Sequence, residues 1–207
     1  MELRGRLFMR VVILRHGTTE LNKQGIIQGS GVNPDLSVEG REYAEKAAKN
    51  FDPSQFDAVY ASPLKRAQQT ARIFVGNETP IETDKRIEEL NYGSWDGKPV
   101  NEYRVKYPDA FNSKGLINDN IYKYASNVEK REDFRKRIAS FFDDIYEKHE
   151  NDTVLVVCHG VVSRMICAHF LTNGDIKYFD QMQNCGLAEL DVNKDYGTLV
   201  YYNRVLA

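Results

Sequence analysis

Arginine and histidine stand together where an apolar run ends near the start of the chain. The run VVIL at residues 11–14 indicates a buried strand, and Arg15, His16 and Gly17 follow it directly. A guanidinium binds phosphate oxygens through paired hydrogen bonds, and a neutral imidazole is a nucleophile. These residue types at a rigid strand end predict phosphate chemistry. Either residue alone is more often a surface charge or a structural hydrogen bonder.

Two further predicted strands end in residues of the same kind. One is followed by Ser62 and, a turn later, Arg66; the other by His159 and Gly160. Ligands of open α/β sheets bind at the carboxyl ends of the strands, so we expect these groups to meet if the strands are parallel and adjacent. The helices that start there would direct free N–H groups to the same point. The alternative is that Arg66 belongs to a solvated helix face.

Strands and helices alternate along most of the chain. Strands are predicted at 10–14, 57–61, 81–83, 153–158, 187–191 and 198–203. Helices are predicted at 37–50, at 62–74 with Ser62 as N-cap and Pro63 at the first helical position, at 131–148, and from 159 to 171. This order predicts an α/β fold, a three-layer α/β/α sandwich with a mostly parallel central sheet.

The length of 207 residues favours a single domain covering 1–207. Residues 93–130 break the alternation: they are rich in Tyr, Asn and Lys and have no clean period. We expect this insertion to act as a lid or specificity loop. Residues 1–8 are interpreted as a short extension.

Composition excludes several function classes. A formal charge of -2 argues against a general nucleic-acid binder or a polybasic membrane surface. No apolar run approaches the roughly 20 residues that span a bilayer, and no signal peptide is evident. The three cysteines form no CxxC pair, which is typical of reduced thiols in a cytoplasmic protein.

Four stretches resemble the histidine phosphatase superfamily, which includes phosphoglycerate mutase, in both order and spacing. They are LRHGTTELN, ASPLKRAQQTA, EELNYGSWDG and VVCHGVVSRMI, and NPDLSVEGREYA is similar to a segment of the same family. The tripeptide RHG alone would be weak evidence, whereas the set is specific. The resemblance spans about residues 10–190 and is poorest in the middle.

The resemblance implies that His16 is the nucleophile and forms a phosphohistidine that water later hydrolyses. Arg15, Arg66 and His159 would hold the phosphoryl oxygens and stabilise their charge. The imidazole must be neutral to attack, and neighbouring arginines disfavour its protonated form. We expect a backbone carbonyl to hold the other ring nitrogen, through the turn that Gly17 permits.

The leaving alkoxide needs a proton, and the resemblance assigns the acid to Glu89, with Glu88 as its outward-facing neighbour. A glutamate that acts as an acid near neutral pH needs a raised pKa. Tyr92 and Trp95 are expected to help by excluding water.

The expected substrate-binding set is Arg15, Asn22, Gln28, Gly29, Arg66 and Gly160, with the resemblance implying that Asn22 donates to the phosphate. No metal and no cofactor are expected, because arginines supply the positive charge. A thiol mechanism or metal site at Cys158 and Cys167 is the weaker alternative.

The predicted partner is a small-molecule phosphomonoester, with hydrolysis favoured over phosphoglycerate mutase activity. Family mutases carry a paired arginine in the insertion, whereas this insertion has scattered basic residues: Lys98, Arg104, Lys106, Lys114, Lys123 and Lys130. Its aromatic residues indicate either a ring-bearing substrate or the lid's own core. A catalytically idle phospho-ligand-binding module and a homodimer remain open alternatives.

Overall fold

Six strands form one mixed sheet in the order β3-β2-β4-β1-β5-β6. The computed structural model describes residues 8–194 and 196–207, so the predicted extension at 1–8 lies outside it except for residue 8. The strands are β1 Met9–Arg15, β2 Ala58–Ala61, β3 Glu82–Thr83, β4 Thr153–Cys158, β5 Leu187–Val192 and β6 Gly197–Arg204. β4 pairs in parallel with β1 and β2, and β2 with β3, whereas β5 runs antiparallel to β1 and β6.

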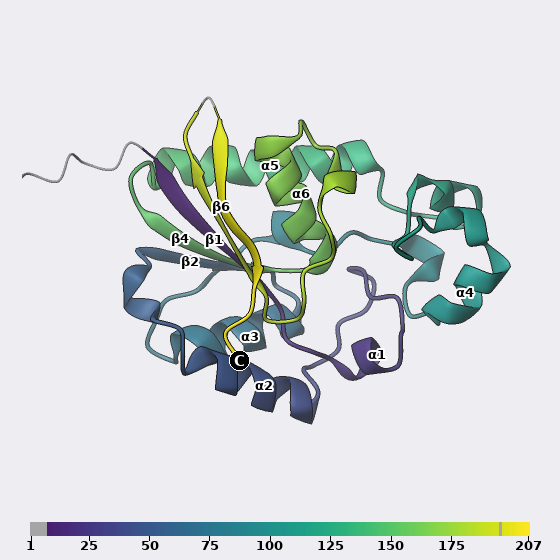
Figure 1. The fold of residues 1–207 in the computed structure, drawn as a ribbon, viewed down its shortest axis with the longest axis horizontal. Helices are drawn as coiled ribbons and strands as arrows, with labels where there is room; N and C mark the ends of the chain where they lie inside the picture. The colour runs from purple at the N-terminus through teal and green to yellow at the C-terminus, as the bar shows by residue number, and fades with distance from the viewer. Residues whose placement is uncertain (1–7, 195) are drawn as a thin grey trace, which may run out of the picture.

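Helices cover both faces of the sheet, which confirms the predicted three-layer α/β/α fold (Figure 1). They are α1 Glu20–Lys23, α2 Val38–Ala48, α3 Lys65–Val75, α4 Val100–Lys106, α5 Arg131–Lys148 and α6 Gly160–Leu171. One hydrophobic cluster joins α5 and α6 to one face, and a second joins α2 and α3 to the other. The successive residues of β1 and β4 point alternately into these two clusters, because side chains alternate along a strand.

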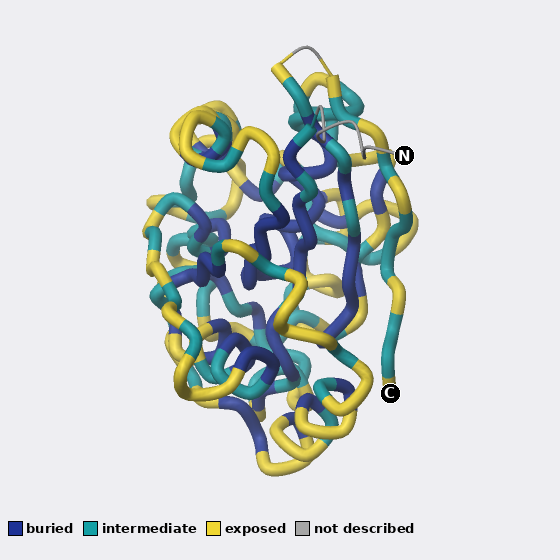
Figure 2. The backbone as a smooth tube through the Cα atoms, turned by 90° about the vertical axis from the view of Figure 1, so that its left-hand side faces the viewer, coloured by how far each residue is buried: buried dark blue, intermediate teal, exposed yellow. Residues whose placement is uncertain are grey.

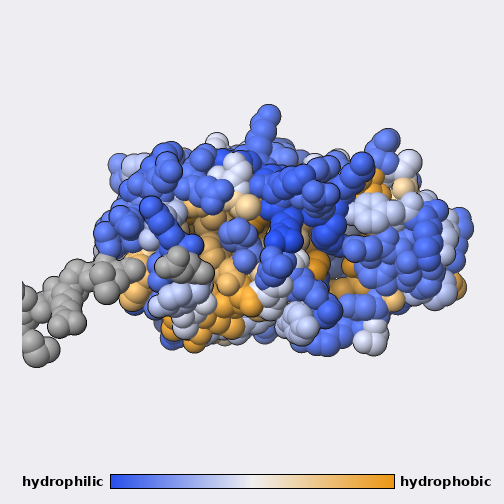
Figure 3. Space-filling model, turned by 90° about the horizontal axis from the view of Figure 1, so that it is seen from above, coloured by the Kyte–Doolittle hydropathy of each residue, from blue (hydrophilic) through white to orange (hydrophobic). Residues whose placement is uncertain are grey.

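The centre of the sheet is the most deeply buried part of the molecule (Figure 2). Every residue of β4 is buried, and so are five of the seven residues of β1. Strands covered on both faces are continuously apolar, as their sequences are. Hydrophilic side chains cover most of the face seen in Figure 3, and hydrophobic ones show mainly in recesses.

The insertion has a hydrophobic core of its own. Trp95 is almost fully buried, stacks on Tyr107 and Phe111, and meets Tyr103 edge-on. The segment, which contains α4, projects at the right of Figure 1. Most of its aromatic residues therefore serve the insertion's own core, which was the second of the two sequence-based interpretations.

The predicted start of α3 was wrong by two residues. The helix begins at Lys65 with Leu64 at the N-cap, and no side chain caps it. The hydroxyl of Ser62 is engaged elsewhere, with His159, as described below. The N–H of Lys65 donates to Asn33 Oδ1 at 2.8 Å, so the start of α3 is satisfied within the protein.

Candidate active site

The chain is rigidly held where β1 ends. The backbone N–H of His16 donates to the carbonyl of Cys158 in β4 at 2.9 Å. The N–H of Gly17 donates to Thr70 Oγ1 in α3 at 2.9 Å. A side chain on Gly17 would meet the carbonyl of Gly40 at 3.3 Å, so a small residue suits this turn. The strand end therefore fixes the position of the His16 ring.

The His16 imidazole is held neutral and in one tautomer. Its Nδ1 lies 2.7 Å from the carbonyl of Gly17, which can only accept, so the proton is on Nδ1 and Nε2 keeps its lone pair. Burial, and then the charges of Arg66 and Arg15, hold the pKa of His16 well below its ordinary value. Both expectations for this residue, the carbonyl partner and the effect of the arginines, are confirmed.

His159 lies beside His16, with 5.1 Å between the ring centroids. Its Nε2 is 2.7 Å from Ser62 Oγ, and that hydroxyl accepts the N–H of Leu64 at 3.3 Å. The Ser62 hydroxyl has no other acceptor among the described residues, so it donates to Nε2, which places the imidazole proton on Nδ1. This Nδ1 is buried and has no hydrogen-bond partner among the described residues.

Two arginines of the cluster, the half-buried Arg15 and the fully buried Arg66, are held by backbone carbonyls instead of acids. Arg15 donates to the carbonyl of Met182. Arg66 donates to the carbonyls of Val32 at 3.0 Å and Gly29 at 3.2 Å. The Nε of each guanidinium is buried without a partner among the described residues. Positive charge and free donors are thus preserved for an anion.

Glu89 presents a buried carboxyl group at the start of α6. Its Oε1 accepts the N–H of Leu90 at 2.9 Å and its Oε2 accepts the N–H of Val161 at 3.0 Å. These bonds and the nearby arginines favour the ionised form, but burial outweighs them and raises the pKa of Glu89. Its neighbour Glu88 is half-buried and lines a different surface hollow.

Thr19 orients two side-chain amides, a role that the sequence did not reveal. Its backbone N–H donates to Asn22 Oδ1 at 3.1 Å, and its hydroxyl donates to Gln28 Oε1 at 2.8 Å. The oxygen of each amide is thereby occupied, which leaves the nitrogen to donate. Gln28 Nε2 is buried and has no partner among the described residues.

A cavity of about 260 Å³ opens at this cluster. Five of the predicted site residues line it: Arg15, His16, Asn22, Gln28 and Glu89. Arg66 and His159 are fully buried and do not line the cavity, and the charge of Arg66 lies close enough to lower the pKa of both His16 and His159, after the larger effect of burial. The three strand ends therefore meet as expected.

Gly29 and Gly160, predicted to bind substrate, do not line the cavity. Gly29 donates its N–H to Asp96 at 2.6 Å and offers its carbonyl to Arg66, so it positions that arginine. A Cβ on Gly160 would lie 1.8 Å from Gln181 Nε2, so the glutamine side chain covers it. The sequence signal for the role of Gly29 was the pair Asp96-Gly97. Such a pair marks a turn, where the aspartate carboxylate can accept backbone N–H groups.

The rest of the cavity lining combines apolar and polar side chains. The apolar ones include Ile26, Ile27, Val100, Leu116 and Ile117, and the polar ones are Tyr92, Arg164 and Gln181. None of the six basic residues of the insertion lines the cavity. Trp95 was expected to shield Glu89 and does not line it either, because it belongs to the insertion's core.

Sequence reasoning missed Arg164 and Gln181. Arg164 stands in the quoted stretch VVCHGVVSRMI, five residues after His159, and this spacing on a helix was the available signal. Gln181 lies in an irregular segment without a pattern.

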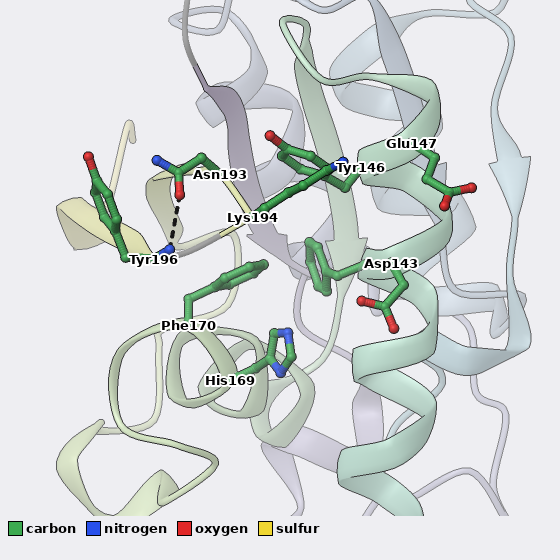
Figure 4. A pocket seen from close by; sticks show the side chains of 9 residues that line it. Asp143, Tyr146, Glu147, His169, Phe170, Asn193, Lys194 and Tyr196 are labelled. Carbon is green, nitrogen blue, oxygen red and sulfur yellow. Dashed lines mark hydrogen bonds between the residues drawn. The ribbon is translucent and has the colours of Figure 1, made fainter.

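A larger cavity, of about 450 Å³, lies between α5, α6 and the β5–β6 connection (Figure 4). The carboxylates of Asp143 and Glu147 line it, and among the described residues Lys194 is its single Lys or Arg side chain. Carboxylates repel a phosphate, so this cavity is a poor candidate for the same chemistry.

The three cysteines are buried and outside the active-site cavity. Burial raises the pKa of Cys167 and Cys185 to about 12, and that of Cys158 rises as well. A thiolate mechanism at these residues is therefore disfavoured. Among the described residues no group of three or more His, Cys, Asp or Glu side chains is arranged to hold a metal ion.

Comparison with known proteins matches residues 11–205 to the model of the histidine phosphatase superfamily (branch 1). Phosphoserine phosphatase 1 of Hydrogenobacter thermophilus is 32% identical over 162 residues, which are 77% of this chain and 75% of that protein. Adenosylcobalamin/alpha-ribazole phosphatase of Escherichia coli is 27% identical and covers 94% of this chain and 96% of its own. The structure of the alpha-ribazole phosphatase from Shigella flexneri has a TM-score of 0.79 at 26% identity, over 95% and 96% of the two chains.

No helix in the described part of the chain is both long and apolar enough to cross a membrane.

Replacing Ser62 by Ala removes the partner that orients His159. We expect kcat/KM for a phosphomonoester to fall by about twofold to tenfold, the effect of one buried hydrogen bond, and the pH profile to change because Nε2 can then take the proton. The control is Ser163→Ala, which removes a buried hydroxyl bonded only to the carbonyl of Gly160. Equal losses in both variants, with unchanged pH profiles, would contradict the positioning role.

The raised pKa of Glu89 predicts a pH-dependent stability. Between the ordinary pKa of 4.5 and the raised folded value, the folded state keeps a proton that the unfolded state releases. The contribution of Glu89 to the free energy of unfolding therefore falls as the pH rises through that window. Relative to wild type, Glu89→Gln should gain stability between pH 4.5 and pH 7.5.

Urea unfolding at both pH values measures this difference. Glu88→Gln serves as the control, because that carboxylate has no hydrogen bond or ion pair among the described residues. A difference between Glu89→Gln and wild type that does not grow with pH would refute the shift.

Proposed function

Since the chain belongs to the histidine phosphatase superfamily and is a phosphatase, we propose that it hydrolyses a small phosphomonoester without a metal ion, through a phosphohistidine on His16. The observation that carries the proposal is the His16 ring. Its Nδ1 is held by Gly17, its Nε2 lone pair remains available, and burial with two arginines keeps it neutral.

In the first step His16 Nε2 forms a bond to phosphorus while the bond from phosphorus to the ester oxygen breaks. Glu89 gives its proton to the leaving oxygen, so an alcohol departs and a carboxylate remains. In the second step water attacks the phosphohistidine, Glu89 takes a proton from that water, and His16 is regenerated with inorganic phosphate. The raised pKa of Glu89 supports its role as the acid.

The phosphoryl oxygens are proposed to bind the free donors of the cluster. Arg15 and Arg66 each offer an unpaired Nε, and His159 offers Nδ1–H. The amide nitrogens of Asn22 and Gln28 complete the set. Preorganised donors of this kind stabilise charge that develops in the transition state.

Hydrolysis is favoured over phosphoglycerate mutase activity by the lining of the cavity. A mutase must hold a second phosphoryl group, whereas the insertion contributes no basic side chain to the wall. Conversion of 3-phosphoglycerate to 2-phosphoglycerate in the presence of bisphosphoglycerate tests this directly. An isomerisation rate above the rate of phosphate release would favour the mutase.

We also propose that residues 93–130 act as the lid of a single-domain enzyme. Gly115, Leu116 and Ile117 from this segment line the cavity. The neighbouring Lys114 forms an exposed ion pair with Asp180, the residue before Gln181. Such a pair is weak, so this contact can break at little cost, whereas residues 96–100 are hydrogen-bonded to the loop at 25–31.

Replacing His16 by Ala should lower phosphate release from p-nitrophenyl phosphate by roughly 10⁴-fold or more, because the nucleophile is lost. Wild-type turnover should persist in EDTA, and brief reaction with labelled substrate should leave an acid-labile, base-stable label on the protein. Loss of activity in EDTA would overturn the metal-free mechanism. A label that persists in His16→Ala would overturn the assignment of the nucleophile.

Replacing Glu89 by Gln should slow hydrolysis of an alkyl phosphate by about 10²-fold to 10⁴-fold, because an alkoxide leaves poorly without a proton. Hydrolysis of p-nitrophenyl phosphate should fall much less, because p-nitrophenolate is a stable anion. The matched change Glu88→Gln should leave both rates close to wild type. If Glu88→Gln is the inactive variant, or if Glu89→Gln slows both substrates equally, the acid is wrongly assigned.

A further inference from the structure

Arg164 is a buried guanidinium that lines the cavity and forms no salt bridge among the described residues. It is only 4% exposed. Nε donates to the carbonyl of Phe179 at 2.8 Å, and Nη2 to the carbonyl of Ile176 at 3.0 Å. These bonds fix the plane of the guanidinium, and within residues 8–194 and 196–207 no further partner occupies Nη1 or the second hydrogen of Nη2.

Two other arginines of this protein are each paired with a carboxylate. Arg137 pairs with Glu129 at 2.6 Å, and Arg86 pairs with Asp84 at 2.7 Å, although both arginines are more exposed than Arg164. Burying a charge without a counter-charge is unfavourable, and more so at greater depth. The arrangement around Arg164 is therefore explained best by an anionic group that arrives with a ligand.

The positive charges around the cavity exceed the charge of one phosphate, so they can balance one further anionic group. In the reactive state Glu89 is protonated, so Arg15, Arg66 and Arg164 carry three positive charges. A phosphomonoester dianion compensates two of them, and Arg15 and Arg66 lie next to the reacting His16. Arg164, which also lines the cavity, remains for one further negative charge.

A carboxylate fits this place better than a second phosphate. The unused edge of one guanidinium matches the two oxygens of a carboxylate. A phosphate dianion would need additional cations, and the lysines of the insertion do not line the wall. The cavity volume of about 260 Å³ admits only a small ligand, and drug-sized ligands occupy roughly 300–1,000 Å³.

We propose that Arg164 is a specificity-determining residue that binds a carboxylate of the substrate, so the enzyme acts on small phosphorylated carboxylic acids. Gln181 lines the same cavity, and the aliphatic side chains of the lining, among them Leu116 and Ile117, would contact the carbon skeleton. The inference rests on the proposed phosphatase reaction at His16 and specifies its substrate class.

Two phosphomonoesters that differ only in the carboxylate test the proposal. 3-Phosphoglycerate carries a carboxylate where glycerol 3-phosphate carries a hydroxymethyl group. We expect kcat/KM of the wild-type enzyme to be about tenfold to a hundredfold higher for the acid, because a charged site discriminates strongly against a partner that leaves it unpaired. A ratio near 1 for wild type would overturn the proposal.

Arg164→Gln should bring the ratio of the two kcat/KM values close to 1, with most of the change in KM for the acid. Arg164→Lys keeps the charge but loses the planar fork and should give an intermediate ratio. The matched control is Arg72→Gln: Arg72 also donates to backbone carbonyls, at 2.8, 2.9 and 3.0 Å, and it lies outside this cavity. Its ratio should equal that of wild type.

A purely structural role for Arg164 predicts that Arg164→Gln lowers both kcat/KM values equally and leaves the ratio unchanged, which would contradict the proposal. Where this variant does not fold, Gln181→Glu gives the same information, since it places a carboxylate in the lining of the same cavity without removing a bond to the backbone. It should lower the ratio selectively, and an unchanged ratio would count against the proposal.

If the proposed phosphatase reaction itself is wrong, the same assays give a different result from a missing carboxylate site. In that case neither substrate nor p-nitrophenyl phosphate would be hydrolysed, or hydrolysis would survive His16→Ala. Hydrolysis of p-nitrophenyl phosphate that depends on His16, without preference for the acid, would overturn only the carboxylate site.

Discussion

The structure depends on burying positive charge where the parallel strands end, without neutralising it internally. Arg15 and Arg66 lie in a water-poor cluster, where an unpaired charge costs several kcal/mol in free energy. A carboxylate partner would remove that cost and would also cancel the attraction for phosphate. The protein uses backbone carbonyls instead, those of Met182, Gly29 and Val32. Carbonyl dipoles stabilise a guanidinium while leaving its net charge intact.

Carbonyl partners place a strict demand on the loops that supply them, because a loop that moves leaves a buried donor unsatisfied. Gly29 illustrates how the demand is met. Asp96 accepts its N–H, and a Cβ there would lie 2.3 Å from the carbonyl of Leu90, so no larger residue fits. The same loop then offers two carbonyls to Arg66. The acidic side chain thus acts on the loop backbone, where it can fix the geometry without forming an ion pair with the arginine.

The fold and the cluster of arginines and histidines at the strand ends were readable from the sequence because both follow from local patterns. Apolar runs gave the strands, and their ends carried Arg15, His16 and His159, which a parallel sheet must bring together. The predicted start of α3 was wrong because Ser62, whose residue type favours the N-cap position, is hydrogen-bonded to His159. The two residues are far apart in sequence, so no local pattern indicates this bond. Arg164 was missed for a similar reason. Its orientation is set by carbonyls of an irregular segment that no periodicity predicts.

Helix α6 links the chemistry to the recognition of the substrate. His159 is its N-cap, the N–H of Val161 in its first turn holds Glu89, and Arg164 follows within the next turn. A helix is stiff along its axis, so these three groups keep a constant spacing, and a substrate gripped by Arg164 has its phosphoryl group placed relative to Glu89 and His159. The binding energy of the carboxylate is then available for orientation at the reacting phosphorus, since the two ends of the ligand are held by one element.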